Sequence, residues 1–201
     1  MHVLSAWVAA TALVGSSAPT LREVLPTLPN DVLPIVSGKT GHALTGTDRL
    51  ALIRVDDPVH GYMELGTGDT DSFEGAQLAL FKVKAKAPAD AGVLVAVRAA
   101  FGDTTNQIAI LRREGGTWHD VTAAVMPKLT AAMVDRRAQE KIPALKKRHQ
   151  KLTDGASGTY AYKLPRIGTT IDVVTSSDSV GYDVVLWHVT FDGVAFSLAP
   201  D

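Results

Sequence analysis

Val93-Leu-Val-Ala-Val-Arg-Ala-Ala-Phe101 is the stretch that decides the fold, because its side chains follow a period of two. Successive side chains of a strand point to opposite faces of a sheet. One face would carry Val93, Val95, Val97, Ala99 and Phe101, and the other Leu94, Ala96, Arg98 and Ala100. The pattern therefore predicts a β-strand over these residues.

Further strand candidates lie on both sides of this stretch, at residues 76–84, 108–113, 160–164 and 182–187. The last of them carries apolar side chains on both faces, so we expect it to be a central strand. Pro165 follows the strand candidate at 160–164 and has no N–H to give to a ladder. We therefore expect that strand to end before Pro165.

Two short connections predict β-hairpins. Arg113-Glu-Gly-Gly-Thr-Trp118 places two glycines, which adopt positive φ at little cost, between two strand candidates. Phe191-Asp-Gly-Val194 offers Asp-Gly between apolar residues. Short connections imply antiparallel neighbours, and no βαβ alternation is visible. The predicted fold class is α+β, mainly antiparallel β-sheet built from hairpins or a meander, with a minor helical insertion.

The helical insertion is predicted at residues 131–152. Steps of three and four residues there separate Val134, Ala138, Ile142, Leu145, His149 and Leu152. Thr130 is a candidate N-cap, and Pro143 is expected to break or kink the helix or to begin a second one. The opposite face carries Arg136, Arg137, Lys141, Lys146, Lys147, Arg148 and Lys151 against Asp135 and Glu140. Such a face is usually only solvated, so a weak anionic partner at Arg136, Lys147 and Lys151 is the alternative.

The N-terminal residues resemble a targeting segment. Residues 1–18 contain no Asp, Glu, Lys or Arg, and residues 3–14 form an apolar run that is too short to span a bilayer. We predict a removed signal peptide over residues 1–18, and hence a periplasmic or extracellular protein. The alternative is a buried N-terminal helix. No other run is apolar and long enough to be a membrane span.

Residues 19–45 read as a proline-rich N-terminal arm, and residues 46–201 as a single β-rich domain. The arm contains four prolines within residues 19–34. A short amphipathic helix, limited by Pro26, is suggested by Leu21, Val24, Leu25 and Leu28.

Composition excludes several chemistries. The chain of 201 residues has no cysteine, which removes disulfides, Cys-ligated zinc, iron–sulfur clusters and thiol nucleophiles. Hydrophobic residues make up 46%, so a packed core is expected. The formal net charge is −1, which makes a nucleic-acid partner unexpected.

No catalytic or metal-binding motif is complete. In the acidic segment at 69–75, Asp69 and Asp71 fit the first two ligands of a calcium loop, but Phe73 and Leu80 occupy later ligand positions. There is no HExxH, no G-x-S-x-G and no glycine-rich phosphate loop. We therefore predict no catalytic residue, metal or cofactor.

Scattered polar residues remain as weak binding candidates: Asp56, His119, Asp120 and Arg166. Asp56 and Asp57 are adjacent, so on a strand they would face opposite ways, and a solvated turn before Pro58 is the expected role of the pair. His119 follows Trp118, and His188 follows Trp187, which predicts surface histidines beside buried tryptophans.

Seven segments occur in a recognisable order: 56–65, 79–82, 94–97, 115–122, 126–129, 162–171 and 182–187. The order resembles a family of uncharacterised exported bacterial proteins with D…GY-x-E, G-x-W-x-DVT…P and LPR-x-GT-x-I motifs. The similarity covers about residues 50 to 198. It implies export and a common β-rich fold, and no mechanism.

The sequence therefore favours a non-catalytic exported binding or envelope-associated module. The alternative is a hydrolase or small-molecule-binding protein whose site is assembled from Asp56, His119, Asp120 and Arg166. A pocket that joins several of these four residues would favour this alternative.

Overall fold

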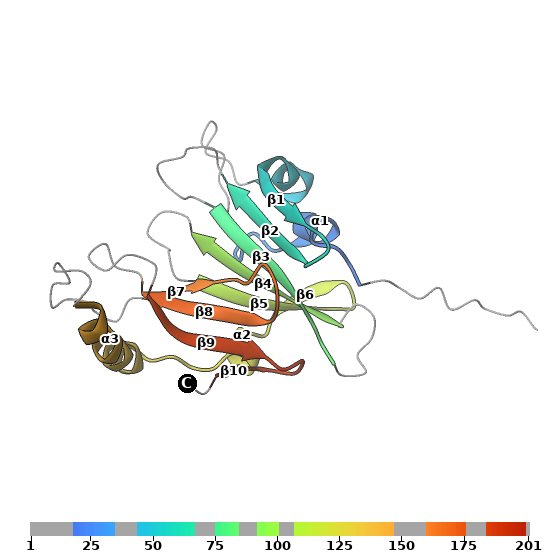
Figure 1. Ribbon diagram of the computed structural model, residues 1–201. Coiled ribbons are helices and arrows are strands. Elements are labelled where there is room, and N and C mark those ends of the chain that lie inside the picture. The colour runs from blue at the N-terminus through green and yellow to red at the C-terminus, as the bar shows by residue number, and fades with distance from the viewer. Residues whose placement is uncertain are drawn as a thin grey trace, which may run out of the picture.

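The computed structural model describes residues 18–34, 44–66, 75–84, 92–100, 107–146, 160–175 and 184–199. These residues form two antiparallel sheets with few helices, which confirms the predicted fold class (Figure 1). In the six-stranded sheet, sequential neighbours are β1 (Ile53–Asp57), β2 (Tyr62–Gly66), β3 (Gly75–Lys82), β4 (Val93–Ala100), β5 (Gln107–Glu114) and β6 (Thr117–Asp120). The four-stranded sheet has β7 (Tyr160–Lys163), β8 (Thr170–Thr175), β9 (Val185–Phe191) and β10 (Phe196–Leu198), again in chain order.

The five strands that were predicted from the sequence are all present. β4 covers the predicted strand at 93–101 as far as Ala100, and β3 and β5 match the candidates at 76–84 and 108–113. β7 ends at Lys163, before Pro165, as expected. β9 has a strand on each side and is therefore central, although residues 182–183 of the predicted segment lie outside the described residues.

The main core lies between the two sheets. It contains Tyr62, Ala79, Phe81, Leu94, Ala96, Ile110, Val125, Tyr162, Leu164, Ile171, Val173, Val189, Phe191 and Phe196. The other face of the six-stranded sheet packs against the N-terminal arm through Met63, Leu65, Ala76, Leu78, Val95, Val97 and Leu111. β3 and β4 are thus apolar on both faces because each face has its own covering layer.

The arm forms two short helical turns that lie on this second face. α1 (Leu21–Val24) has Thr20 as its N-cap, with Glu23 completing a capping box. A 3₁₀ turn, η1 (Leu25–Thr27), continues it and holds Pro26 in its first turn. The four apolar residues that suggested a helix, Leu21, Val24, Leu25 and Leu28, are all buried against the sheet.

A buried arginine ties the arm to the rest of the chain. Arg49, in the 3₁₀ helix η2 (Gly46–Leu52), has 0% of its surface exposed. Its guanidinium donates to five acceptors: the carbonyls of Leu25 (3.3 Å), Leu28 (2.6 Å), Leu33 (3.3 Å) and Leu44 (3.0 Å), and Asn30 Oδ1 (2.6 Å). Burial lowers the pKa of Arg49 from its ordinary value, but a guanidinium remains charged at neutral pH. All five acceptors belong to the arm (residues 19–45), so Arg49 holds the arm to η2.

Both predicted hairpins are confirmed. β5 and β6 meet through Gly115 and Gly116, whose φ angles are +56° and +85°. β9 and β10 pair around Gly193, which has φ +103°. Asp192 shapes this second turn by accepting from the N–H groups of Val194 (2.8 Å) and Ala195 (3.0 Å).

The predicted helix is α3 (Ala131–Lys146), which lies beside β9 (Figure 1). The Thr130 hydroxyl accepts from the Met133 N–H at 3.3 Å, which confirms the cap. Val134 and Ala138 pack on Leu186 of β9, as the apolar face predicts. The helix continues through Pro143, so the break there and a second helix beginning there are wrong, whereas the kink stays a prediction. Only one described turn follows Pro143, and a single lost hydrogen bond does not divide the helix.

The basic face of α3 is not wholly in water. Arg137 Nε donates to the carbonyl of Leu186 at 3.1 Å, and its Nη1 bonds to Glu140 at 3.1 Å. Arg137 therefore helps the helix to dock on β9. Arg136 is exposed, whereas Lys147 and Lys151 lie outside the described residues.

The aromatic residues divide into core and margin. Phe191 and Phe196 are buried, as predicted. Trp118 and Trp187 are only half-buried, because β6 is an edge strand and Trp187 packs at the margin of the core. Trp118 Nε1 donates to Thr27 of the arm at 3.0 Å. His119 and His188 are exposed, as expected beside the tryptophans.

Candidate functional site

Three loops meet at one end of the two sheets. They are the β1–β2 turn (58–61), the β7–β8 loop (164–169) and the β9–β10 loop (192–195), which we call together the loop end (Figure 1). The first two are joined by Asp57 and Arg166, whose side chains bond at 2.9 Å. The second reaches the third because the Phe191 N–H donates to the Thr169 carbonyl at 3.0 Å.

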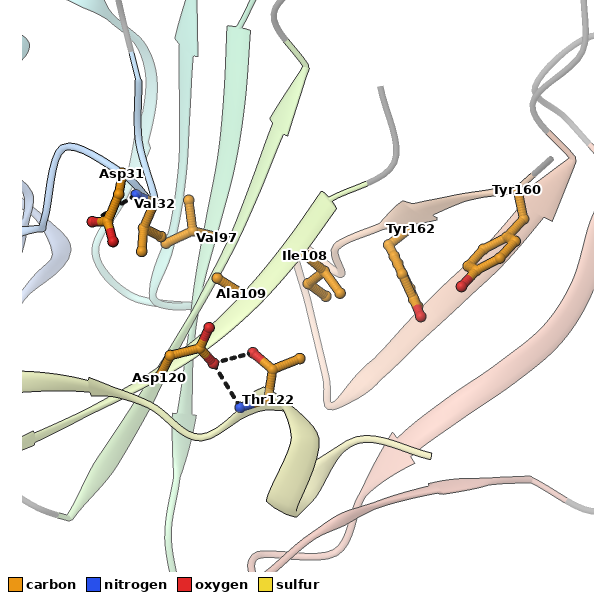
Figure 2. A pocket seen from close by; sticks show the side chains of 9 residues that line it. All are labelled: Asp31, Val32, Val97, Ile108, Ala109, Asp120, Thr122, Tyr160 and Tyr162. Carbon is orange, nitrogen blue, oxygen red and sulfur yellow. Dashed lines mark hydrogen bonds between the residues drawn. The ribbon is translucent and has the colours of Figure 1, made fainter. Parts of the chain in front are cut away.

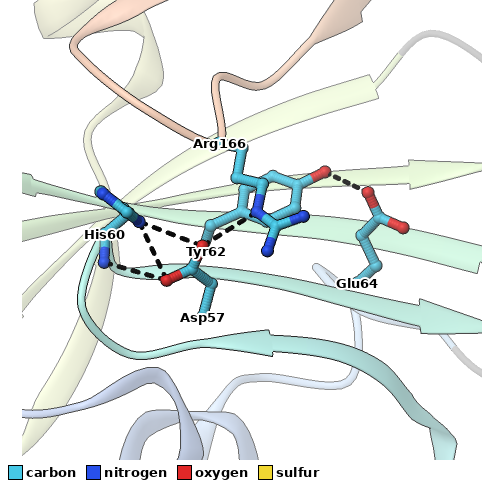
Figure 3. A network of polar contacts seen from close by, with 5 residues as sticks. All are labelled: Asp57, His60, Tyr62, Glu64 and Arg166. Atoms are coloured by element: carbon cyan, nitrogen blue, oxygen red, sulfur yellow. Dashed lines mark hydrogen bonds and ion pairs between the residues drawn. The ribbon is translucent and has the colours of Figure 1, made fainter.

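Asp57 is the centre of a polar network at the loop end (Figure 3). Arg166 Nε donates to Asp57 Oδ2 at 2.9 Å, and His60 Nδ1 lies 3.0 Å from Oδ1. The backbone N–H of His60 donates to the same carboxylate at 3.3 Å. Only 12% of the Asp57 side chain is exposed, against 61% for Arg166, so the carboxylate is enclosed by its partners.

These contacts favour the charged form of Asp57. The hydrogen bond from Arg166, followed by that from His60, lowers the pKa of Asp57 from its ordinary value of 3.8 to about 2. The same bond raises the pKa of Arg166. At neutral pH the pair is therefore an ion pair, and Asp57 holds no proton to give.

The pH dependence of stability follows from this shift. Asp57 has a lower pKa in the folded than in the unfolded chain, so its contribution is complete above about pH 4 and is lost between about pH 4 and 2. We expect the difference in unfolding free energy between the wild type and Asp57→Asn to shrink as the pH falls through this window. Urea unfolding at a series of pH values measures it. A difference that stays constant from pH 6 to about pH 2 would contradict the pairing.

A second chain of hydrogen bonds ties the β7–β8 loop to the larger sheet. The Tyr62 hydroxyl donates to Glu64 Oε1 at 2.5 Å and accepts from Gln77 Nε2 at 3.1 Å. Gln77 Oε1 in turn accepts from the Leu164 N–H at 3.3 Å. Burial, with Glu64 as the second cause, raises the pKa of Tyr62 above its ordinary value. Tyr62 thus stays protonated and serves as a donor.

The largest exposed apolar side chains of the described residues all lie at the loop end. Val59 in the first loop is 85% exposed, Ile167 in the second is 70% exposed and Val194 in the third is 62% exposed. Single exposed aliphatic residues are common on protein surfaces. Three on adjoining loops, each loop held by side-chain or backbone bonds, are apolar side chains fixed in position at the same end of the sheets.

A separate hollow of about 390 Å³ lies at the edge of β5 (Figure 2). We call it the β5 cleft. It is lined by Asp31, Val32, Val97, Ile108, Ala109, Asp120, Thr122, Tyr160 and Tyr162. Asp120 accepts from the N–H (2.8 Å) and the hydroxyl (2.5 Å) of Thr122, which opens the short helix α2 (Thr122–Val125).

The four polar candidates from the sequence are not brought into one pocket. Asp56 bonds to Arg22 of α1 at 2.9 Å, and Arg166 bonds to Asp57. Asp120 lines the β5 cleft, and His119 is exposed on β6. Asp56 and Asp57 do bond to separate partners, as residues on opposite faces of a strand should.

Asp57, His60, Tyr62 and Glu64 were not predicted as a set, and the solvated-turn role was wrong for Asp57, whose side chain is only 12% exposed. These four residues lie in the 56–65 segment, and Arg166 lies in the 162–171 segment. Both segments belong to the ordered motifs that carry the family resemblance. The order of those segments was the available signal, but their contact depends on the packing of one sheet against the other.

Comparisons of the chain with models of protein families, with curated proteins and with solved structures give no match. Within the part of the chain that the structure describes, no three His, Cys, Asp or Glu residues are grouped as metal ligands. No helix among those same residues has the length and apolar character to cross a bilayer.

Proposed function

We propose that this chain is a non-catalytic, exported binding module that attaches to a lipid surface of the cell envelope through the loop end. The observation that carries the proposal is the position of Val59, Ile167 and Val194 on three adjoining loops, each fixed by bonds to the sheets. Apolar side chains that are held in water by a rigid frame are typical of contact surfaces.

The polar groups beside these side chains support binding rather than catalysis. A general acid or base must have a proton site that is free to exchange with a substrate near neutral pH. Asp57 is held ionised by Arg166 and His60, and Tyr62 is held protonated by burial and Glu64. Their hydrogen bonds instead hold the β7–β8 loop against the larger sheet.

Exposed cations at the same end favour an anionic surface. Lys82 ends β3, Lys84 bonds through its N–H to Gly193, and Lys163 ends β7. All three side chains are exposed, and none makes an ion pair within the described residues. Basic side chains near apolar ones add electrostatic attraction to the burial of aliphatic groups in a membrane interface.

The test is sedimentation of the purified full chain with vesicles of phosphatidylglycerol and phosphatidylcholine. We expect binding that weakens with salt, and a loss of at least about tenfold in affinity for the triple variant Val59→Ser, Ile167→Ser, Val194→Ser. The reason is that each buried aliphatic CH₂ contributes about 0.8 kcal/mol to insertion.

The matched control is Ala51→Ser with Ala132→Ser, two exposed positions on η2 and α3. Because these positions lie outside the three loops, this variant should bind as the wild type does. Equal binding by the triple variant and the wild type, or no binding by the wild type at low salt, would contradict the proposal.

A further inference from the structure

At the β5 cleft, the hydrogen-bond ladder between β5 and β6 covers only part of the length of β5. β5 pairs with β6 only from Glu114 to Leu111, where Leu111 lies opposite Asp120. Beyond this point the chain leaves the sheet and turns into α2. β5 continues to Gln107 and remains paired with β4 over this length. Within the described part of the chain, the first residues of β5, from Gln107 to Ala109, therefore have a neighbouring strand on one side only.

The hydrogen bonds of Ile110 show which backbone N–H and C=O groups of β5 face the β6 side. The C=O of Ile110 accepts from the Val121 N–H at 2.9 Å, and the Ile110 N–H donates to Thr122 Oγ1 at 2.7 Å. Ile110 thus points its backbone groups to the β6 side. In a strand, residues two apart point the same way, so Ile108 does the same. Among the described residues none bonds to these groups of Ile108.

The two sides of β5 differ in chemistry (Figure 2). Asp31 and Asp120 lie with Ala109 on the side that faces the arm, and both carboxylates belong to exposed residues. Ile108, Tyr160 and Tyr162 lie on the side that faces the smaller sheet, with the two rings edge to face at 5.5 Å. The lining contains two carboxylates and no cationic side chain.

From these features we infer that the β5 cleft binds an extended peptide that adds a strand to β5 in the place that β6 leaves. The N–H and C=O of Ile108 form the backbone bonds, as in other cases of strand addition. Side chains of the added strand alternate, so one set meets Asp31 and Asp120 and the other meets the tyrosines. The bound sequence is therefore basic at one set of alternate positions and apolar or aromatic at the other.

This inference uses a different surface from the loop end, so its test is independent of the proposed function. The probe is a fluorescent, N-acetylated and C-amidated hexapeptide, Lys-Val-Lys-Tyr-Lys-Val, with anisotropy measured against the full chain. We expect saturable binding that weakens with salt. A Glu-Val-Glu-Tyr-Glu-Val peptide should bind at least about tenfold more weakly, because it meets like charges.

Backbone methylation tests strand addition directly. Each alternate set of N–H groups in the peptide faces either β5 or away from it. N-methylation of one set should weaken binding at least about tenfold, and methylation of the other set should change it by less than about twofold. Equal affinity for both methylated peptides would overturn the inference.

A variant of the protein tests the acidic side. Asp31→Asn should weaken binding about three- to tenfold at low salt and leave it unchanged at high salt. Asp48→Asn, an exposed carboxylate that does not line the cleft, is the matched control and should bind as the wild type does. Absence of binding up to about 1 mM peptide would overturn the inference. A dimer of this chain that is lost in Ile108→Pro would also overturn it, because a second copy would then occupy the edge.

Discussion

Replacing Arg49 by methionine should lower the free energy of unfolding by about 3–5 kcal/mol and release the N-terminal arm from the sheet. Methionine fills a similar volume but donates no hydrogen bond. Three carbonyls and the amide oxygen of Asn30 would then lose the donor that compensates their burial. Leu25 retains one weaker bond, from the Leu28 N–H.

The loss has an upper limit, because the arm can leave the sheet and return these carbonyls to water. The free energy of unfolding then falls only by the stabilisation that the arm gains from burying five side chains on the six-stranded sheet. They are Leu21, Val24, Leu25, Leu28 and Leu33. Urea unfolding measures the free energy, and limited proteolysis within residues 18–34 reports arm release. We expect cleavage of the variant in the arm before the sheets unfold.

Two controls separate the hydrogen bonds from the loss of a charge. Arg49→Lys keeps the charge but offers three donors in place of five bonds, so its loss should be intermediate. Arg54→Met changes an exposed arginine of β1 and should cost less than about 0.5 kcal/mol. An Arg49→Met protein that unfolds as the wild type does would show that the hydrogen bonds of Arg49 contribute nothing.

Local patterns predicted most of the fold, and the reason is physical. A period of two depends only on neighbouring residues, so β4, β5 and β7 were found within one or two residues of their bounds. Gly115-Gly116 and Asp192-Gly193 were equally local, because a tight turn needs positive φ at particular positions. Pro143 misled the prediction because its effect depends on how much helix follows it.

Contacts between distant segments were beyond these patterns. In the sequence, nothing distinguishes Arg49 from an arginine on the surface. Its acceptors come together only when the arm folds. Asp57 and Arg166 are separated by 109 positions and meet because the β7–β8 loop crosses to the larger sheet. The β5 cleft likewise depends on where β6 leaves the sheet. The predictions that failed at Asp57 and at the tryptophans are of this kind, since burial at a sheet margin has no signature in sequence period.

A second large effect on stability is expected at Phe81, which lies in the aromatic centre of the main core. Phe81 of β3 is 1% exposed and packs edge to face on Phe191 of β9 at 5.6 Å and on Phe196 of β10 at 5.0 Å. Such pairs contribute about 0.5–1.5 kcal/mol beyond the burial of their area. This single side chain therefore joins the larger sheet to two strands of the smaller one.

Phe81→Ala should lower the free energy of unfolding by about 3–5 kcal/mol, because it removes a buried ring and leaves a cavity between two sheets that cannot both close on it. Phe81→Leu keeps most of the volume and should cost less than about 2 kcal/mol. Leu80→Ala changes the preceding residue, whose side chain is half-buried on the opposite face of β3. It is the matched control and should cost less than Phe81→Ala.

Urea unfolding followed by both tryptophan fluorescence and far-UV circular dichroism measures the loss of stability in each variant. If the sheets form one cooperative unit, the two signals will change together in every variant. A loss below about 1 kcal/mol for Phe81→Ala would contradict the role of this ring in joining the two sheets.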